Sequence, residues 1–419
     1  MKSSLYHSKL PKDTVSALQK KARGYSDLIE EVRKHNDYSH PESSLFIAGD
    51  KEYQSAIRKK LGPFKGVKRV ILVAIGGSIQ GTHAVYKALS TNEKQLTIVD
   101  SVEEDTLKKV EEIVNSVNDS RHIALVIVSK SGTTTETMLN SLKIIEMWER
   151  KFGDAFHKRV IFIGNEGTEF LALGEKRGIT CFSIPGSIGG RFSVFTAVGI
   201  VPLTLLGINV AALTKGAVEA LAKGELRAIE KNAVTLAAYA ETGVHTVNFF
   251  TFNKRLELLG FWYRQLLAES IGKDKTTAGE PFTKQLLPVV STSTDLHSVA
   301  ELYLGGYKGI YTHFIYHKEG RSYRLPTSHW MLEHVPFLKG KKVSDVKDII
   351  TESVLRAYND QRLPYRYTEI DTCTAHEVGA VLATLMAEVM YLGNLFDIDT
   401  FGQPSVEFYK KYMRTALTT

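Results

Sequence analysis

The hydrophobic and polar positions of this chain alternate between short apolar runs and amphipathic stretches. Residues 69–75 (RVILVAI) and 122–128 (HIALVIV) are almost entirely apolar and rich in β-branched side chains, which is typical of strands covered on both faces. A polar or glycine-rich turn follows each run, and a stretch with helical periodicity follows the turn. Strands that alternate with helices in this way predict βαβ units around a parallel sheet.

The same alternation predicts the other elements of two α/β domains with mostly parallel sheets. In the first domain, further strands are expected at residues 96–99, 159–163 and 179–184, and helices at residues 83–89, 106–117 and up to residue 148. In the second domain, strands are expected at residues 245–252, 285–290, 308–317 and 366–370, and helices at residues 256–271 and 344–358. Residues 217–241 are expected to form a helix, and residues 376–413 are expected to be helical with a break at FDIDTFGQP.

Five segments follow from this pattern. A helical segment that packs on the first domain is expected at residues 1–60, and the first α/β domain at residues 61–215. A connecting helix follows at residues 216–243, then the second α/β domain at residues 244–395 and a helical tail at residues 396–419. The length of 419 residues agrees with two domains, because a single core rarely grows so large.

One uncharged stretch lies between Arg191 and Lys215 and is long enough to suggest a membrane span. Polar residues such as Ser193, Thr196 and Asn209 dilute it. We therefore expect a buried core helix there and no association with a membrane.

Composition and charge narrow the class of protein. Hydrophobic residues make up 43% of the chain and charged residues 24%, which excludes a disordered or collagen-like chain. The formal net charge of +7 suits a protein that handles anionic small molecules, and without a dense Lys/Arg block or zinc-finger spacing we do not expect nucleic acid as a partner. Cys181 and Cys373 are too few for a disulfide scaffold or a four-cysteine zinc site. No apolar signal segment opens the chain, so the cytoplasm is expected.

Two turns that follow strands could bind an anion. The turn IGGSIQG at residues 75–81 lets backbone amides approach a ligand, but it is neither a P-loop nor a G-x-G-x-x-G sequence and could be only a tight turn. The segment SKSGTTT at residues 129–135 carries five hydroxyl side chains at a predicted helix start. One helix cap needs one hydroxyl, so the excess favours phosphate binding over simple capping. Both turns follow the carboxyl ends of strands, where open α/β sheets bind ligands.

Four single residues could carry acid–base or electrostatic chemistry, although each also has a plain structural explanation. Arg191 follows two glycines and could face an anionic intermediate or be a surface arginine. Glu269 precedes a glycine turn and could be a general base, with Gln265 on the same helical face, but most such glutamates are solvated. His297 could be an acid or a base or be structural, and Lys410 opens the last helix, where lysines usually face solvent.

Taken in order, six motifs resemble those of the phosphoglucose isomerase family. They are VAIGGSIQG, VSKSGTTTET, GGRFSVFTAVGIVPL, LLAESIGKD, TSTDLHS and FGQPSVEFYKKYM. They extend over residues 70–413 in the family's order. The resemblance implies two sugar isomerase (SIS) domains with three α/β/α layers each, and interconversion of glucose 6-phosphate and fructose 6-phosphate through a cis-enediol intermediate, in glycolysis and gluconeogenesis. It implies no metal or other cofactor, and a cytoplasmic homodimer in which His297 reaches the active site of the partner subunit.

The resemblance also assigns roles residue by residue. Glu269 would move the proton between C1 and C2, and Arg191 would stabilise the enediolate. His297 and Lys410 would assist opening of the sugar ring, with Lys411 as the alternative because Ser405 and Tyr409 stand where relatives often have glycine. The remaining residues would bind substrate. Ser129, Ser131 and Thr134 would hold the phosphate, with Lys130 and Thr133 nearby. Gly77 and Ser78 would line the sugar site, and Gln265 would help to position the substrate.

Three other functions remain open. One is a related SIS isomerase that also accepts mannose 6-phosphate. An amidotransferase-type glucosamine-phosphate isomerase is disfavoured, because no N-terminal glutaminase with its leading cysteine precedes the first domain. A non-catalytic sugar-phosphate sensor would keep SKSGTTTET but would not need Glu269, His297 and Lys410.

Overall fold

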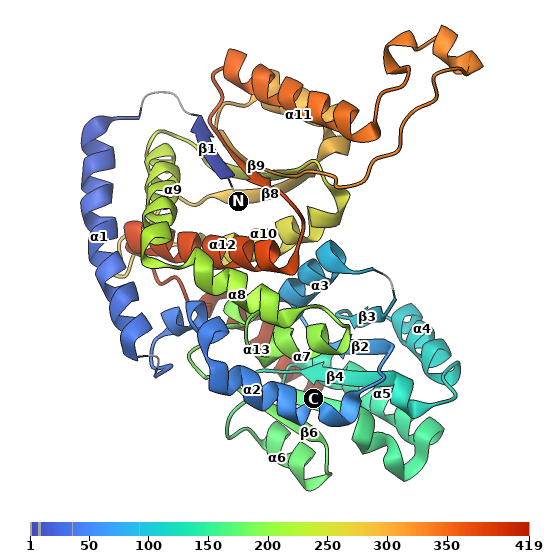
Figure 1. Cartoon of the computed structure of the whole chain (residues 1–419). Helices are drawn as coiled ribbons and strands as arrows, with labels where there is room; N and C mark the ends of the chain where they lie inside the picture. The colour runs from blue at the N-terminus through green and yellow to red at the C-terminus, as the bar shows by residue number, and fades with distance from the viewer. Residues whose placement is uncertain (1, 7–9, 36, 92, 419) are drawn as a thin grey trace.

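The computed structural model describes residues 2–6, 10–35, 37–91 and 93–418. Two five-stranded sheets dominate the architecture (Figure 1). The first sheet is wholly parallel and has the order β3 (Gln95–Val99), β2 (Arg69–Val73), β4 (Ile123–Val128), β5 (Val160–Asn165), β6 (Thr180–Ile184). Every residue of β4 is buried, as the continuous apolar run predicted.

Helices cover both faces of this sheet. They are α3 (Gly77–Leu89), α4 (Glu104–Asn115), α5 (Thr135–Phe152), α6 (Glu169–Lys176) and α7 (Ala197–Leu205). Successive side chains of β2 point to opposite faces. Ile71 and Val73 join a core with α4 and α5, whereas Val70 and Leu72 join a larger core with α3 and α7. That larger core continues into the second domain through Trp262.

The second sheet has the order β8 (Leu287–Thr292), β7 (Thr246–Thr251), β9 (Ile310–His317), β10 (Tyr365–Ile370), β1 (Lys2–Tyr6). The first four strands are parallel, and β1 is antiparallel to β10. Its helices are α10 (Glu257–Ile271), α11 (Val343–Asp360) and α12 (Ala375–Leu395). These two mostly parallel sheets confirm the predicted α/β class.

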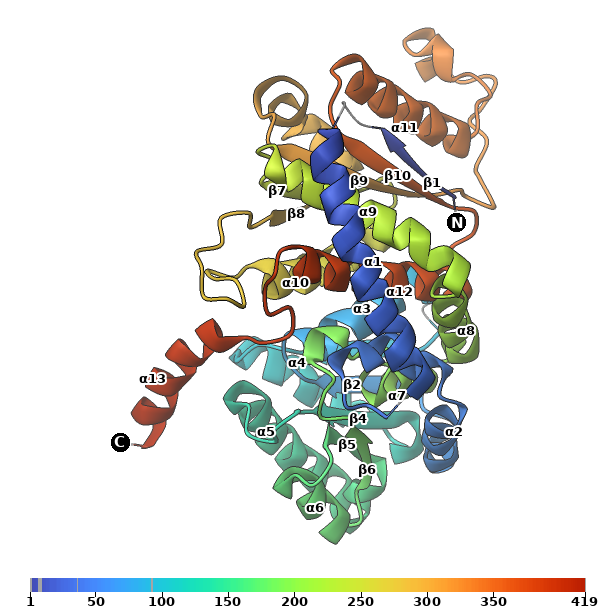
Figure 2. The same cartoon turned by 90° about the vertical axis from the view of Figure 1, so that its left-hand side faces the viewer.

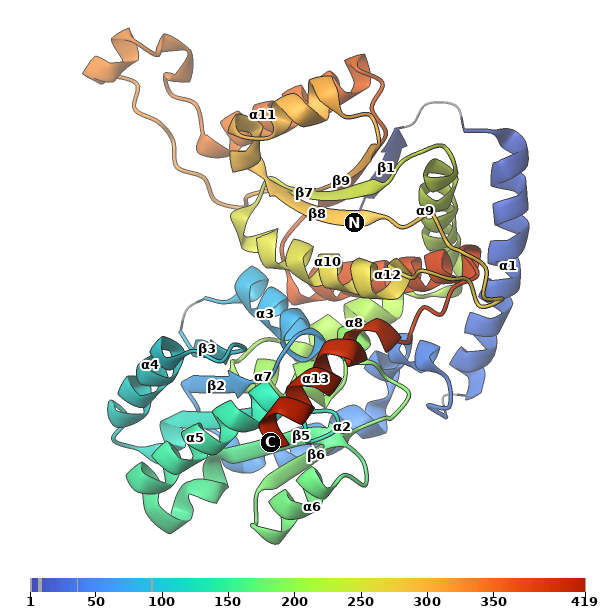
Figure 3. The ribbon, with the colours of Figure 1, turned by 180° about the vertical axis from the view of Figure 1, so that it is seen from behind.

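The domains meet through helices of the second domain. Figures 1 and 3 both show α10 and α12 between the second sheet and the first domain. There α10 packs on α3, and α12 packs on α8 (Val210–Ala220). Because α10 carries Glu269, this packing brings that carboxylate to the junction of the two domains.

The predicted helical segment at residues 1–60 contains α1 (Lys12–His35) and α2 (Lys51–Lys60). The sequence analysis missed β1, because five residues beside a sheet edge show no pattern of their own. It also placed this whole segment on the first domain, whereas α1 packs against α9 (Lys223–Glu241) and α12. At the other end, α13 (Glu407–Thr418) extends away from the body (Figure 2). The domain boundaries stay predictions.

The uncharged stretch differs from the single buried helix that we predicted. It contains a 3-10 turn at Gly190–Phe192, then α7, and then the start of α8. Gly207 has a φ of +80°, a left-handed conformation that favours glycine and ends the helical path after α7. A second break separates α8 from α9 within the predicted helix at residues 217–241. Among the described helices, α12 is long and apolar enough to cross a membrane, but 89% of its apolar window is buried inside the protein.

Candidate active site

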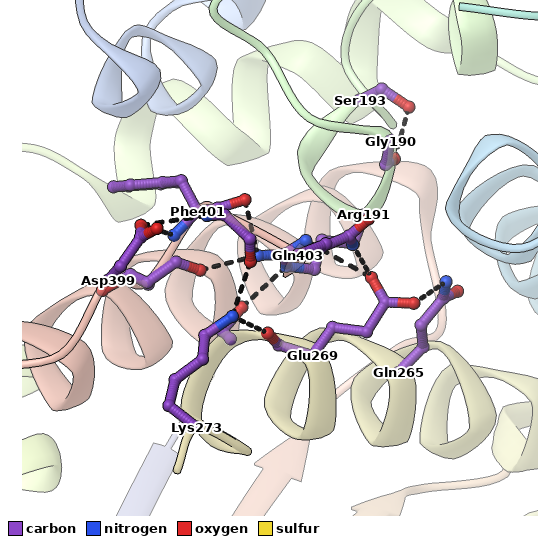
Figure 4. Close-up of polar contacts among 12 residues, drawn as sticks. Gly190, Arg191, Ser193, Gln265, Glu269, Lys273, Asp399, Phe401 and Gln403 are labelled. Atoms are coloured by element: carbon purple, nitrogen blue, oxygen red, sulfur yellow. Dashed lines mark hydrogen bonds and ion pairs between the residues drawn. The ribbon is translucent and has the colours of Figure 1, made fainter. Parts of the chain in front are cut away.

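Three segments that are distant in the sequence meet at the carboxylate of Glu269 (Figure 4). Gln265 lies one helical turn earlier on α10, and its Nε2 donates to Glu269 Oε1 at 2.8 Å. Arg191 comes from the 3-10 turn of the first domain, and its Nη1 lies 3.3 Å from Glu269 Oε2. Gln403, from the loop after α12, donates to the same Oε2. The structure therefore brings together three of the candidate residues, Arg191, Gln265 and Glu269, and their roles stay predictions.

Arg191 is almost fully engaged by the protein. Its side chain is only 2% exposed, against 30% for Glu269. Nε donates to Ser270 Oγ at 2.8 Å, and Nη2 donates to the main-chain carbonyl oxygens of Thr400 and Phe401 at 2.6 and 3.1 Å. Burial lowers the pKa of the Arg191 guanidinium from its ordinary value, and the charge of Glu269 opposes that shift. An arginine nevertheless stays protonated, so the site holds a fixed buried positive charge.

Gly77 allows the start of α3 to approach the arginine turn. A Cβ on Gly77 would overlap the backbone of Arg191 and would lie 2.6 Å from the carbonyl carbon of Gly190. The preceding Gly76 has a φ of +57°, and a Cβ there would lie 3.2 Å from Gln265 Nε2. The side chain of Ser78 also lies beside Gly190, where α3 meets the arginine turn. The N-terminus of α3 thus borders the Arg191–Glu269 pair.

The hydroxyl-rich segment forms a compact turn at the N-terminus of α5. Ser129 is buried, and its Oγ accepts from the Gly132 amide at 3.1 Å and donates to Thr134 Oγ1 at 3.3 Å. The hydroxyls of Ser131 and Thr133 lie 2.9 Å apart. Gly132 takes a φ of +73°, and a Cβ there would overlap Phe170. Hydroxyls and amides at the start of a helix form the kind of cluster that binds phosphate.

Lys130 connects this turn to the segment that leads to Arg191. Its Nζ donates to the carbonyl oxygens of Gly186 and Ile188 at 3.0 and 3.2 Å. Burial lowers the pKa of the Lys130 ammonium group from its ordinary value. Lys130 therefore links the turn at the start of α5 to the segment that precedes the arginine turn.

His297 and Lys410 are not part of this cluster within one chain. His297 is exposed, in the 3-10 turn Ser293–His297 after β8. Lys410 lies on α13 and pairs with Glu407 at 2.7 Å. Within the described parts of the chain, neither side chain bonds to Arg191, Gln265 or Glu269. Their predicted roles stay predictions.

The sequence analysis missed Ser270, Lys273 and Gln403 as members of the site. Lys273 Nζ donates to the main-chain carbonyl oxygens of Glu269 and Gly402, at 2.8 and 2.5 Å. All three lie inside two of the motifs that carried the resemblance, LLAESIGKD and FGQPSVEFYKKYM. Their place inside these motifs was the available signal. A side chain that acts by holding a neighbouring residue has no sequence pattern that distinguishes it from the rest of the motif.

The described residues offer no metal site. In the ranges that the structure covers, no group of three or more His, Cys, Asp or Glu side chains is arranged to hold a metal ion.

The chain resembles known proteins in sequence and in fold. The sequence profile of the phosphoglucose isomerase family matches residues 50–418. A glucose-6-phosphate isomerase of Methanocaldococcus jannaschii is 31% identical over 365 residues, covering 84% of this chain and 85% of that protein. Among solved structures, a hypothetical protein of Thermus thermophilus superposes with a TM-score of 0.83 at 23% identity, covering 99% of this chain and 100% of that one. A glucose-6-phosphate isomerase of Chlamydia trachomatis superposes with a TM-score of 0.76 at 18% identity, covering 99% and 88%.

Proposed function

The chain belongs to the phosphoglucose isomerase family, and we propose how its residues interconvert glucose 6-phosphate and fructose 6-phosphate, the family's step in glycolysis and gluconeogenesis. The observation that carries the proposal is the carboxylate of Glu269, held by Gln265 on one oxygen and by Arg191 on the other. Aldose–ketose isomerisation needs a base beside C1 and C2 and positive charge where an oxyanion develops. A part-exposed carboxylate against a buried guanidinium supplies both.

Glu269 is the base in this proposal. Its carboxylate takes the proton from C2 of the open-chain aldose, which leaves a cis-enediolate with its hydroxyl on C2. The hydroxyl proton passes from O2 to O1, and the protonated Glu269 returns the first proton to C1, which gives the ketose and restores the carboxylate. Gln265 and Arg191 hold the two oxygens in one orientation, so the base needs no rearrangement at the moment of transfer. The exposed Gln403 also donates to Oε2 and helps to hold the carboxylate.

Arg191 stabilises the enediolate. Of its five N–H donors, one on Nε and two on Nη2 go to Ser270, Thr400 and Phe401, and one on Nη1 goes to Glu269. Among the described residues, one Nη1 donor has no protein partner, and we assign it to a substrate oxygen. Because the other four are bound, the charge is preorganised and does not move as negative charge develops.

The hydroxyl-rich turn anchors the phosphate in this proposal. Ser129, Ser131 and Thr134, with Lys130 and Thr133 beside them, bind the phosphate at the start of α5. Gly77 and Ser78, which lie beside the arginine turn, line the sugar site in this proposal. Binding energy gained at the phosphate orients the reacting carbons without touching them.

Ring opening requires an acid near the ring oxygen, and we assign it to His297 and Lys410. Since the exposed His297 makes no contact with Glu269 in its own chain, we propose a homodimer in which the partner subunit's His297 completes the site. Large apolar side chains exposed on the second domain support such an interface: Leu302, Tyr323, Trp330, Met331 and Phe337. We propose the cytoplasm as its location.

The substitution Glu269→Gln tests the proposal. The amide keeps the shape of the side chain but cannot accept the proton, so we expect kcat to fall by about three orders of magnitude or more, the range for loss of an essential base. Affinity for inorganic phosphate, measured as thermal protection, should stay near wild type because the phosphate turn is untouched.

Conversion of fructose 6-phosphate to glucose 6-phosphate in a coupled assay with a chelator provides the readout. Near-normal turnover of the variant would refute Glu269 as the base. Thermal protection of the wild-type protein by fructose 6-phosphate without any turnover would instead indicate a sugar-phosphate sensor. Parallel assays with mannose 6-phosphate decide the range of substrates.

A further inference from the structure

The loop between α12 and α13 supplies polar partners to two groups of the active site. The carbonyl oxygens of Thr400 and Phe401 accept from Arg191, and the amide of Gln403 donates to Glu269. Asp399 shapes this loop, because its Oδ1 accepts from the main-chain amides of Phe401 and Gly402 at 3.0 and 2.9 Å. The orientation of both catalytic groups therefore depends on where residues 399–403 lie.

Lys273 connects this loop to α10 (Figure 4). Its Nζ donates to the carbonyl oxygen of Gly402 at 2.5 Å and to that of Glu269 at 2.8 Å. The second carbonyl belongs to the last turn of α10, where no intrahelical donor is left. One ammonium group thus bonds the main chain of the base and the loop that contacts its side chain.

Lys273 also adds a positive charge close to the charged groups of the site. The side chain is half-buried, and no described residue places a carboxylate oxygen in hydrogen-bond contact with its Nζ. Burial lowers the pKa of the Lys273 ammonium group from its ordinary value, the charge of Arg191 lowers it further, and the charges of Asp399 and Glu269 oppose these shifts. Two cations, Lys273 and Arg191, therefore flank Glu269.

We propose that Lys273 is a positioning residue of the isomerase: it holds the 399–403 loop against the last turn of α10 and so sets how Arg191 and Gln403 meet the Glu269 carboxylate. The inference rests on the proposed role of Glu269 as base. Lys273 itself touches no reacting atom in this assignment.

Lys273→Met tests the inference, because methionine keeps an unbranched stem and removes the charge and both hydrogen bonds. We expect kcat to fall about 10- to 100-fold, since displacement of a reacting group by about 1 Å can cost that much. KM should stay within about threefold, because the phosphate turn is unchanged. Lys273→Arg, which keeps the charge and the donors, should recover most of kcat.

Lys284→Met is the matched control. Lys284 makes an exposed ion pair with Glu241 at 2.5 Å in the same domain, so its loss should leave the kinetics unchanged. Where Lys273→Met does not fold, Lys273→Gln takes its place, because a single amide reaches only one of the two carbonyls.

Two results would overturn the inference. One is a folded Lys273→Met variant with kcat within about twofold of wild type. The other is a loss of kcat that matches the loss of folded protein and is not restored by arginine. Glu269→Gln separates the two proposals: if it is inactive while Lys273→Met is normal, only the positioning role fails, and if it is active, the base assignment itself fails.

Discussion

At the scale of single residues, the site is built around one buried cation. Arg191 bonds a hydroxyl, a carboxylate and two main-chain carbonyls, which requires a planar fork of donors. Lysine has a compact point charge on a flexible stem and cannot reach all four partners at once. The residue type therefore matters as much as its charge.

Arg191→Lys should show this dependence. The carbonyls of Thr400 and Phe401 would lose donors, and the preorganised charge would be lost. We expect kcat to fall about 100- to 1,000-fold, the usual cost of removing one oxyanion-stabilising group, with a much smaller change in KM. Steady-state kinetics measure kcat and KM, and thermal unfolding shows whether the variant is folded. The control is Arg264→Lys, an exposed arginine of α10. Kinetics close to wild type in Arg191→Lys would contradict the assigned role.

At the scale of elements, the site depends on how closely α3 approaches the arginine turn. Gly77 is the first residue of α3, and it lies against the backbone of Gly190 and Arg191. Backbone contacts of this kind leave no room for a Cβ. The glycine pair in VAIGGSIQG therefore has a packing reason that does not depend on any ligand.

Gly77→Ala should separate these elements. Overpacking of this kind costs about 1–3 kcal/mol, and relief of the overlap would move the arginine turn. We expect lower thermal stability and a kcat at least about tenfold lower, because the base and the guanidinium would lose their alignment. Gly224→Ala serves as the control, since a Cβ there meets nothing within 4 Å. Equal stability and activity of the two alanine variants would contradict the packing argument.

At the scale of the whole molecule, one chain holds only part of the proposed machinery. The carboxylate of Glu269 and the guanidinium of Arg191 meet at the junction of the domains, whereas His297 is exposed in the turn after β8. A two-fold dimer would give each site a base from one subunit and a histidine from the other.

Mixed dimers test this arrangement directly. A Glu269→Gln subunit paired with a His297→Ala subunit would have one site with both defects and one site with none. We therefore expect a heterodimer, isolated through two different affinity tags, to have about half the activity of the wild-type dimer, although each homodimer is weak. If His297 acted within its own chain, both sites of the heterodimer would be defective and activity would stay at the level of the homodimers.

Much of the fold could be predicted from the chain alone. A strand buried on both faces, such as β4, needs apolar residues throughout, so it appears in the sequence as a continuous apolar run. A helix buried on one face needs apolar residues only on that face, so it appears as an amphipathic period. β1 could not be predicted in this way, since it becomes a strand only by pairing with β10. The breaks between α7, α8 and α9 depend on a left-handed glycine and on packing, which hydrophobicity does not record.

For the site, the residue types and their order could be read from the chain: hydroxyls at a helix start, glycines before α3, and the carboxylate, guanidinium, imidazole and ammonium groups in family motifs. Which of these groups meet is a property of the folded molecule. It joined Arg191 to Glu269 across 78 residues, and Gln403 to Glu269 across 134. It also revealed Lys273 as the link between α10 and the loop. The physical reason is that hydrogen bonds act over about 3 Å in space, and distance along the chain carries no information about such contacts.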